Sequence, residues 1–134
     1  MAVCPGQGKF FTWNTLTLPP PGLGSSTAVL DRQRLLERWS RSVDGWAIQE
    51  HGWLMEDRQW ALGWGTKLGG KLFFNGALLG EAGKPRGGTA IFVHQQLEER
   101  FGRVVDHHII QQHYVHAVEF PTAVLLNFYG QQGH

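Results

Sequence analysis

The sequence predicts an α/β fold with a mixed sheet, and two observations carry this prediction. The first is a strand–helix–strand order. An aromatic and β-branched run at residues 9–18 precedes a helix-like segment at 28–42, and a short apolar run follows at 44–50. Since a helical crossover brings two strands into parallel pairing, these strands should be neighbours. The second is the Pro121-Thr122 turn between two strand-like runs, which predicts an antiparallel hairpin.

Length and composition predict one domain. The chain has 134 residues, which suits a single compact unit, and we expect residues 1–134 to form it. A hydrophobic content of 42% is enough for a core, and a charged content of 17% is low for a disordered chain. The 18 glycines and six tryptophans indicate many turns and bulky packing.

Charge and cysteine content restrict the function classes. The formal net charge of +1 gives no global basic field for nucleic acid, although a nuclease can act through local positive charge and a metal ion. The single Cys4 excludes an internal disulfide and a cysteine zinc site. No apolar run approaches the ~20 residues that span a bilayer. Residues 1–9 lack the layout of a secretory signal, so we expect a soluble intracellular protein.

The helix at 28–42 should bury one apolar stripe. Residues 19–22 (three prolines and a glycine) stop the first strand, and residues 24–27 offer capping side chains. Leu35, Leu36, Trp39 and Val43 then share one face. The arginines of this segment fall mostly off that face, and we interpret them as a solvated surface rather than a binding patch.

Residues 51–83 lack clean periodicity, with 72–74 as a strand candidate, and the remainder is expected to be loops with short elements. A strand is predicted at 89–97 after Gly87-Gly88, a connector at 97–102, and strands at 104–110, 113–120 and 123–129. Trp53, Trp60 and Trp64 either stack on nucleic-acid bases or form core beneath a long loop.

A series of weak motifs resembles one family. WN at Trp13-Asn14, a helix, a strand ending in QE, then GGTAIFV, and a hairpin ending in NFYG follow the order of the endonuclease/exonuclease/phosphatase superfamily. That superfamily includes DNase I, the abasic-site endonucleases and the endonucleases of non-LTR retrotransposons. The similarity runs from about Phe11 to Tyr129 and covers only the N-terminal half of the family's domain. It implies an incomplete DNase I-like two-sheet α/β sandwich with one main helix near 28–42.

The resemblance also implies site residues. Asn14 would lie at the catalytic centre, Glu50 would be a divalent-metal ligand, and Tyr129 would approach the phosphate. The residue types suit this chemistry, because Mg²⁺ (or Mn²⁺) prefers oxygen ligands, an amide both donates and accepts, and a phenol donates without adding charge. Arg86, Gly87 and Gly88 would serve the fold.

Each of these residues also has an ordinary structural interpretation. Glu50 could be an exposed carboxylate after a strand, Asn14 could satisfy backbone groups at a strand end, and Tyr129 could pack in the core with its hydroxyl at the rim.

Four histidines are crowded into one short segment of the sequence. His107, His108, His113 and His116 are close in sequence and suggest a zinc site. His113 and His116 would however point to opposite faces of a strand, so we expect surface histidines instead. His51, next to Glu50, is a candidate for contact with the site.

The catalytic residues of the family's second half are absent. The second half carries an Asp-x-Asn motif, a further Asp and a Ser-Asp-His motif, and none of these is in the chain. Leu16 stands where some relatives have an acidic residue, and Gly130 begins the segment where many have a proline. The missing half should also leave one sheet face uncovered, because its partner sheet is missing, which invites association.

The resulting hypothesis is the N-terminal part of a Mg²⁺-dependent phosphodiesterase, with DNA as the expected substrate and no activity alone. The chain would be a fragment, a truncated gene model or a decayed copy. One alternative is a non-catalytic module on a degenerate nuclease scaffold that binds nucleic acid or protein. Another is an unrelated α/β domain whose motif order is coincidental. RNA, a phosphoinositide or another phosphoester stays open as the substrate.

Overall fold

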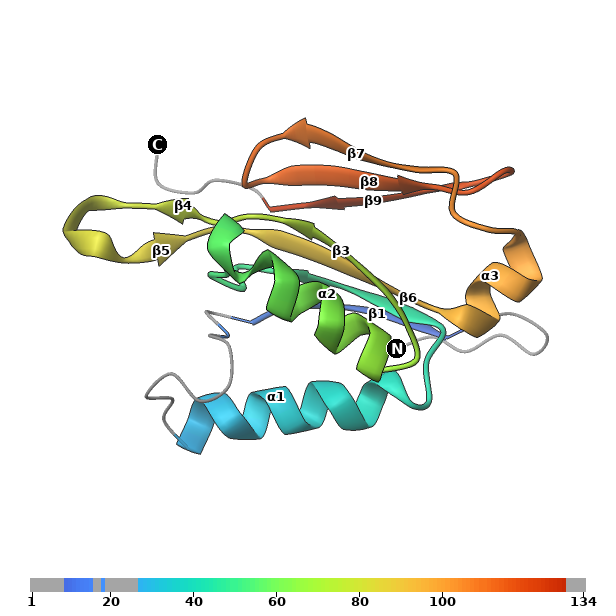
Figure 1. Ribbon diagram of the computed structural model, residues 1–134, viewed down its shortest axis with the longest axis horizontal. Helices are drawn as coiled ribbons and strands as arrows, with labels where there is room; N and C mark the ends of the chain where they lie inside the picture. Colours follow the sequence, from blue (N-terminus) through green and yellow to red (C-terminus); the bar gives the residue numbers. More distant parts are fainter. Residues whose placement is uncertain (1–8, 16–17, 19–26, 130–134) are drawn as a thin grey trace.

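The computed structural model describes residues 9–15, 18 and 27–129. Its elements follow the chain from β1 to β9, with three α-helices and two short 3₁₀ turns, η1 and η2 (Figure 1). They are β1 (Phe10–Asn14), α1 (Thr27–Ser40), β2 (Gly45–Gln49), η1 (Met55–Asp57), α2 (Arg58–Lys67), β3 (Gly70–Asn75), β4 (Leu78–Leu79), η2 (Glu81–Gly83), β5 (Pro85–Arg86), β6 (Thr89–His94), α3 (Gln95–Phe101), β7 (Asp106–Gln111), β8 (Val115–Glu119) and β9 (Val124–Phe128).

The larger sheet is mixed, as predicted. Its strand order is β1-β2-β6-β3. β1 and β2 are parallel, with Phe10 opposite Gly45 and Asn14 opposite Gln49. β6 runs antiparallel to both β2 and β3. The parallel pairing that the strand–helix–strand order predicted is therefore confirmed.

The smaller sheet is antiparallel, with the order β7-β8-β9. The predicted hairpin is present as β8 and β9, which are joined by the turn at residues 121–122. β4 and β5 form a separate two-residue ribbon.

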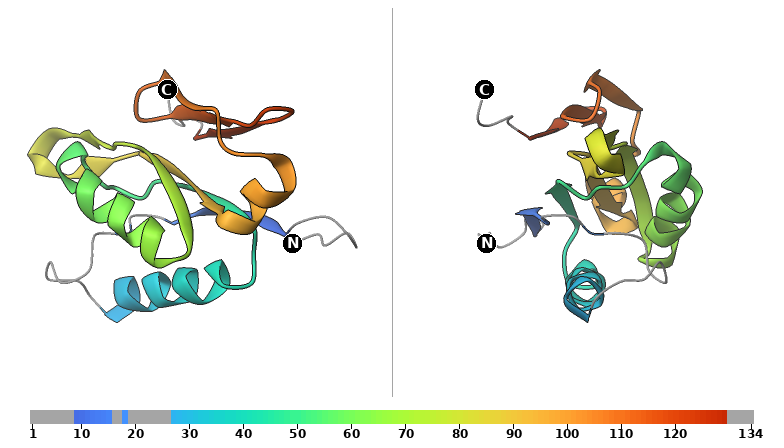
Figure 2. Two further views of the ribbon diagram at one scale, coloured as in Figure 1. Left: turned by 45° about the vertical axis from the view of Figure 1, so that its right-hand side comes forward. Right: turned by 90° about the vertical axis from the view of Figure 1, so that its left-hand side faces the viewer.

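The molecule is built in layers. α1 and α2 lie on one face of the larger sheet and the smaller sheet lies over its other face (Figures 1 and 2). One apolar cluster fills the space between helices and sheet, including Trp46, Ile48 and Phe92. A second cluster lies between the two sheets and includes Ile91 and Val118. Burial of these side chains supplies the main favourable free energy of folding.

The uncovered face is not where the sequence placed it. Both sheets are present and packed together, so the expectation that a partner sheet would be missing is wrong. The uncovered surface is the outer face of the smaller sheet, above β7, β8 and β9 in Figure 1. Val124, Leu126 and Phe128 alternate along β9 and point outward, with 60%, 58% and 64% of their surfaces exposed. The three residues form a solvent-exposed apolar row.

Helix α2, with ten residues, lies in a segment that was expected to be loops with short elements, so the segment is more regular than predicted. Gly63 and Gly65 reduce the helical propensity of residues 58–67. Gly65 has a packing reason, because a Cβ there would lie 2.6 Å from Leu72 Cβ on β3. The glycine lets the helix approach the sheet closely.

The tryptophans of this region are core rather than a stacking platform. Trp53 and Trp64 are buried, and Trp60 packs against the same cluster. Ring centroids lie 5.4 Å apart for Trp60 and Trp64 and 5.9 Å apart for Trp53 and Trp64.

Three further boundaries differ from the predictions. Residues 95–101 form α3 rather than the end of a strand and a connector, and His94 caps this helix by accepting a hydrogen bond from Gln96 N at 3.1 Å. β7 begins at Asp106 instead of residue 104. β8 begins at Val115 because His113 has a φ of 75°, which is not an extended conformation.

The helix α1 ends at Ser40, close to the predicted limit. Its predicted apolar stripe is correct in part. Leu36 and Val43 are buried, whereas Leu35 and Trp39 are exposed. The predicted strand end at 19–22, most of the capping segment at 24–27, Cys4, Leu16 and Gly130 lie outside the described residues.

Within the part of the chain that the structure describes, none of the helices is long and apolar enough to cross a membrane.

Candidate functional site

Asn14 and Glu50 lie at the same edge of the larger sheet. Asn14 is the last residue of β1 and pairs with Gln49, and Glu50 follows directly. Since β1 and β2 are parallel, both carboxyl ends meet at this edge, where α/β sheets commonly bind ligands. Alternation along β1 places Asn14 on the same face as Thr12, which contacts Gln49. That face looks toward the smaller sheet.

Tyr129 meets Glu50 across the two sheets. The Tyr129 hydroxyl donates a 2.5 Å hydrogen bond to Glu50 Oε1. The bond to the carboxylate raises the pKa of Tyr129, and burial adds to the rise. The ring stacks on Tyr114 with centroids 6.1 Å apart, and Tyr129 N donates to Tyr114 O at 2.8 Å. Two residues 79 positions apart in sequence thus form the centre of the candidate site.

Glu50 has a strained backbone. Its φ is 58°, in the left-handed region that few residues other than glycine adopt. The conformation is fixed from two sides, because Glu50 N donates to Gly88 O at 2.8 Å and Glu50 O accepts from Thr15 Oγ1 at 3.2 Å. Local strain of this kind concentrates at functional sites.

Paired substitutions should separate this strain from the contact with Tyr129. Glu50→Ala and Glu50→Gly both remove the hydrogen bond, but only glycine relieves the left-handed backbone. We expect Glu50→Gly to be more stable than Glu50→Ala by about 1 kcal/mol. Chemical denaturation of the two variants measures the difference. Equal stability would show that the backbone at Glu50 carries no strain.

His51 is a core residue and does not contact the Glu50 carboxylate. It is fully buried and stacks on Trp53, with centroids 4.3 Å apart and planes inclined by 18°. Its Nδ1 accepts from Trp53 N at 2.7 Å, and its Nε2 has no hydrogen-bond partner among the described residues. Burial lowers the pKa of His51 to about 3, so the ring is neutral. Gly88 lies against this ring.

His116 is also buried, so the expectation of surface histidines is wrong for this residue. Its Nδ1 lies 2.8 Å from His107 Nε2 and its Nε2 lies 3.0 Å from Asn127 Nδ2. Burial, together with the nearby His107 and His51, lowers the pKa of His116 to about 3. By contrast, His108 is exposed and pairs with Glu119 at 2.8 Å.

The zinc interpretation finds no support in the structure. Over residues 9–15, 18 and 27–129, no group of three or more His, Cys, Asp or Glu side chains is placed to hold a metal ion. The same holds at Glu50, so this carboxylate could supply one ligand of a metal shell and not the whole shell.

Three residues near the site were missed by the motif reasoning. Asn127 precedes Tyr129 by two positions and bonds to Gln49, the residue before Glu50. Arg86 was assigned to the fold, yet its positive charge is near enough to Tyr129 to oppose the rise in the Tyr129 pKa. Asn127, Gln49 and Arg86 stand in the NFYG, QE and RGG motifs. Their position in these motifs was therefore the signal that could have identified them.

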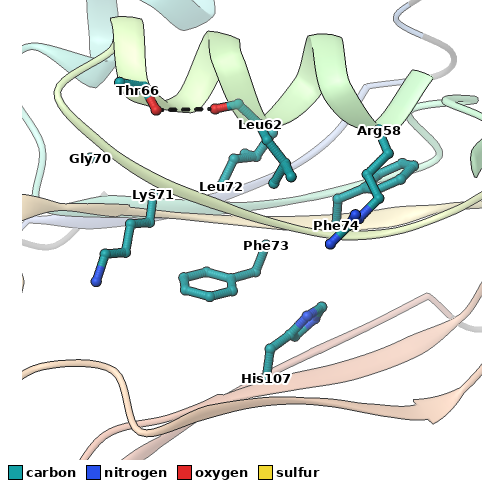
Figure 3. A pocket seen from close by; sticks show the side chains of 9 residues that line it. All are labelled: Arg58, Leu62, Thr66, Gly70, Lys71, Leu72, Phe73, Phe74 and His107. Atoms are coloured by element: carbon teal, nitrogen blue, oxygen red, sulfur yellow. Dashed lines mark hydrogen bonds between the residues drawn. The ribbon is translucent and has the colours of Figure 1, made fainter. Parts of the chain in front are cut away.

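A cavity of about 390 Å³ lies apart from the candidate site, between α2, β3 and β7 (Figure 3). Neither Asn14, Glu50 nor Tyr129 lines it. In Figure 3, Lys71 and Arg58 flank Phe73 and His107 faces them from β7. The lining of the cavity therefore includes two cationic side chains and three aromatic rings, those of Phe73, Phe74 and His107. One of the cations, Lys71, also forms an ion pair with Glu98 at 3.0 Å.

Among solved structures, the chain is similar to the 3′ phosphatase NExo from Neisseria, determined with a product DNA hairpin bound. The TM-score is 0.60 and the sequence identity is 18%, over 92% of this chain and 41% of that chain. No family model matches the chain, and no curated protein matches it by sequence. The structural likeness confirms the predicted fold, an incomplete DNase I-like two-sheet α/β sandwich, and the chain spans about two fifths of the length of that phosphatase.

Proposed function

We propose that residues 1–134 form the N-terminal part of a divalent-metal-dependent phosphodiesterase domain that acts on DNA. The observation that carries this proposal is the Tyr129–Glu50 hydrogen bond at the strand ends, beside Asn14. The fold likeness to a 3′ phosphatase bound to a DNA product supports the substrate class. The motif order favours the abasic-site or non-LTR retrotransposon subtype.

Each residue has a role that its chemistry permits. Glu50 would hold Mg²⁺ or Mn²⁺, hard cations that bind carboxylate oxygens and offset charge on the reacting phosphate. Asn14 would orient a phosphate oxygen or a water molecule, because its amide both donates and accepts. The Tyr129 hydroxyl would exchange its hydrogen bond to Glu50 for one donated to a phosphate oxygen. The positive charge of Arg86 would favour an anionic substrate.

The isolated chain should be inactive. A single carboxylate gives a weak metal site, and the described residues form no group of three or more His, Cys, Asp or Glu side chains that could hold a metal ion there. We therefore expect no Mg²⁺-dependent nicking of a supercoiled plasmid by the 134-residue chain. Robust nicking that Glu50→Ala abolishes would contradict this expectation.

Metal binding tests the site itself. Tb³⁺ prefers oxygen ligands, and its luminescence is sensitised by a nearby tyrosine. We expect weak binding of Tb³⁺ with luminescence that depends on Glu50 and is competed by Mg²⁺. Glu50→Gln should abolish the signal, whereas Glu99→Gln, an exposed acid on α3, should leave it unchanged. An equal signal in wild type and Glu50→Gln would remove the metal-ligand assignment.

The cavity favours a second candidate, a non-catalytic module that binds nucleic acid. Arg58 and Lys71 could contact phosphates while Phe73 offers a ring for stacking. Such a module would bind single-stranded DNA in EDTA, with an affinity that falls as salt rises. Glu50→Ala should not change this binding and Arg58→Glu with Lys71→Glu should weaken it. Absence of binding at low salt would count against the nucleic-acid form of this candidate.

The apolar row of β9 favours association of the protein through the uncovered face of the smaller sheet. Sedimentation velocity should detect association of the chain that Leu126→Lys with Phe128→Lys suppresses. A monomer at all concentrations would argue against it.

A further inference from the structure

The most constrained polar side chain between the two sheets is that of Asn127. It is 3% exposed and projects from β9 toward the larger sheet. Its Nδ2 donates to Ile48 O at 3.1 Å and to Ala90 O at 3.0 Å. These carbonyls belong to residues that face each other on β2 and β6. One amide thus connects β9 to two strands of the other sheet.

The orientation of this amide is determined by its neighbours. Asn127 Oδ1 accepts from Gln49 Nε2 at 2.8 Å. Exchange of the oxygen and nitrogen would place Oδ1 against two carbonyl oxygens and Nδ2 against the Gln49 donor. Both contacts would be repulsive, so only one orientation satisfies the buried groups.

Two histidines support the amide from the other side. His116 pairs with Asn127 in register across β8 and β9, and its Nε2 lies 3.0 Å from Asn127 Nδ2. Asn127 Nδ2 has two hydrogens and three neighbouring acceptors, so one hydrogen is shared between a carbonyl oxygen and His116 Nε2. Since an amide nitrogen does not accept, His116 Nε2 carries no hydrogen and the neutral ring carries its hydrogen on Nδ1. That hydrogen is then directed to His107 Nε2, 2.8 Å away. The result is a continuous chain of hydrogen bonds from β7 to β2.

These hydrogen bonds reach β2 and β9 right beside the candidate site. Gln49 is followed at once by Glu50, and Asn127 shares a strand face with Tyr129, two residues further on. Gln49 is itself held by a second bond, from its Nε2 to Thr12 Oγ1 at 2.9 Å on β1. The apolar contacts between the sheets permit sliding, whereas directional bonds fix the relative position of two strands.

We propose that Asn127 is a positioning residue that fixes β9 on β2 so that the Tyr129 hydroxyl meets the Glu50 carboxylate. The role extends the proposed function, because this pair is the centre of the candidate site. Asn127 would touch neither a metal ion nor a substrate bound at Glu50. It acts by holding the strand that carries Tyr129 in one register over the strand that leads to Glu50.

Spectroscopy of Tyr129 at neutral pH tests the proposal. The ¹³Cζ resonance of a tyrosine responds to the hydrogen bond of its hydroxyl, and the chain has two tyrosines, which Tyr114→Phe distinguishes. Glu50→Ala defines the Tyr129 signal with the hydrogen bond to residue 50 removed. We expect Asn127→Leu to shift the Tyr129 signal toward that reference, although Glu50 and Tyr129 are both intact.

Two further variants make the result decisive. Val118→Ala opens the same inter-sheet core without altering the amide, so it should lower stability and leave the Tyr129 signal at the wild-type position. Gln49→Met removes one bond to Asn127 at a half-buried position, and it should shift the signal in the same direction by a smaller amount. It provides the answer if Asn127→Leu does not fold.

A wild-type Tyr129 signal in folded Asn127→Leu, or in Gln49→Met if the former is unfolded, would overturn the positioning role. A shift in Val118→Ala equal to that in Asn127→Leu would also overturn it, because general loosening would then be the cause. These spectra are recorded without metal or DNA. Failure of the positioning role is therefore distinguishable from failure of the Tb³⁺ test of the metal site.

Discussion

Replacing Gly88 with alanine is expected to destabilise the protein by about 3–5 kcal/mol, from backbone strain and overpacking together. Gly88 has a φ of 91°, which side chains with a Cβ rarely adopt. A Cβ at this position would lie 2.4 Å from His51 Cε1 and 2.7 Å from His51 Nδ1. The His51 ring cannot withdraw easily, because it stacks on Trp53 and accepts a hydrogen bond from the Trp53 backbone. The measurement is the free energy of unfolding from urea titration.

Gly63→Ala is the matched control. Gly63 lies in helix α2, and a Cβ there would meet nothing within 4 Å. This substitution should raise stability by about 0.5–1 kcal/mol, because alanine is the better helix former. Adding His51→Ala to Gly88→Ala should recover part of the lost stability by removing the clash. If Gly88→Ala were as stable as the wild type, the close packing of the His51 ring against Gly88 would be wrong.

Acid should unfold the protein through its buried histidines. Burial lowers the pKa values of His51 and His116 to about 3, from an ordinary value of 6.5. Between these values the unfolded chain binds protons that the folded chain does not, so stability falls as pH falls from 6.5 toward 3. Each histidine should contribute a loss on the order of 3 kcal/mol by about pH 4. For His116 the structural reason is visible, because a proton on Nε2 would face the Asn127 amide hydrogens.

Thermal melts across this pH range measure the loss, and two variants locate it. His116→Gln should flatten the dependence of the melting temperature on pH, since it removes one titrating group. His108→Gln should not flatten it, because His108 is exposed and its bond to Glu119 raises its pKa instead. A melting temperature that stays constant from pH 7 to pH 4 would contradict neutral, buried histidines.

Local sequence patterns determined much of the fold. The apolar run at 44–50, the helix before it and the aromatic run at 9–18 specified a parallel pair, because a helical crossover permits that arrangement. The Pro121-Thr122 turn specified the β8–β9 hairpin for an equally local reason. The motif order around Asn14, Glu50 and Tyr129 predicted the DNase I-like sandwich, and the fold is confirmed. The metal and phosphate roles of these residues stay predictions.

Helix α2 and the burial of His116 could not be derived in this way. Gly65 reads as a helix breaker in the sequence, yet close approach to Leu72 requires it. His116 reads as a surface residue, yet Asn127 and His107 satisfy both of its ring nitrogens. In each case the deciding partner is on another element, so no local window contains the information.

The same distinction between local sequence and tertiary contacts applies to the candidate site. The sequence alone determined that Asn14 and Glu50 end neighbouring strands, since parallel strands finish at one edge. Only the tertiary structure decided that Tyr129 reaches Glu50, that Glu50 adopts a left-handed backbone, and that Asn127 ties the two sheets together beside them. The physical reason is that the Tyr129–Glu50 and Asn127–Ile48 contacts join residues 79 positions apart, whose approach depends on how two separately formed sheets pack face to face.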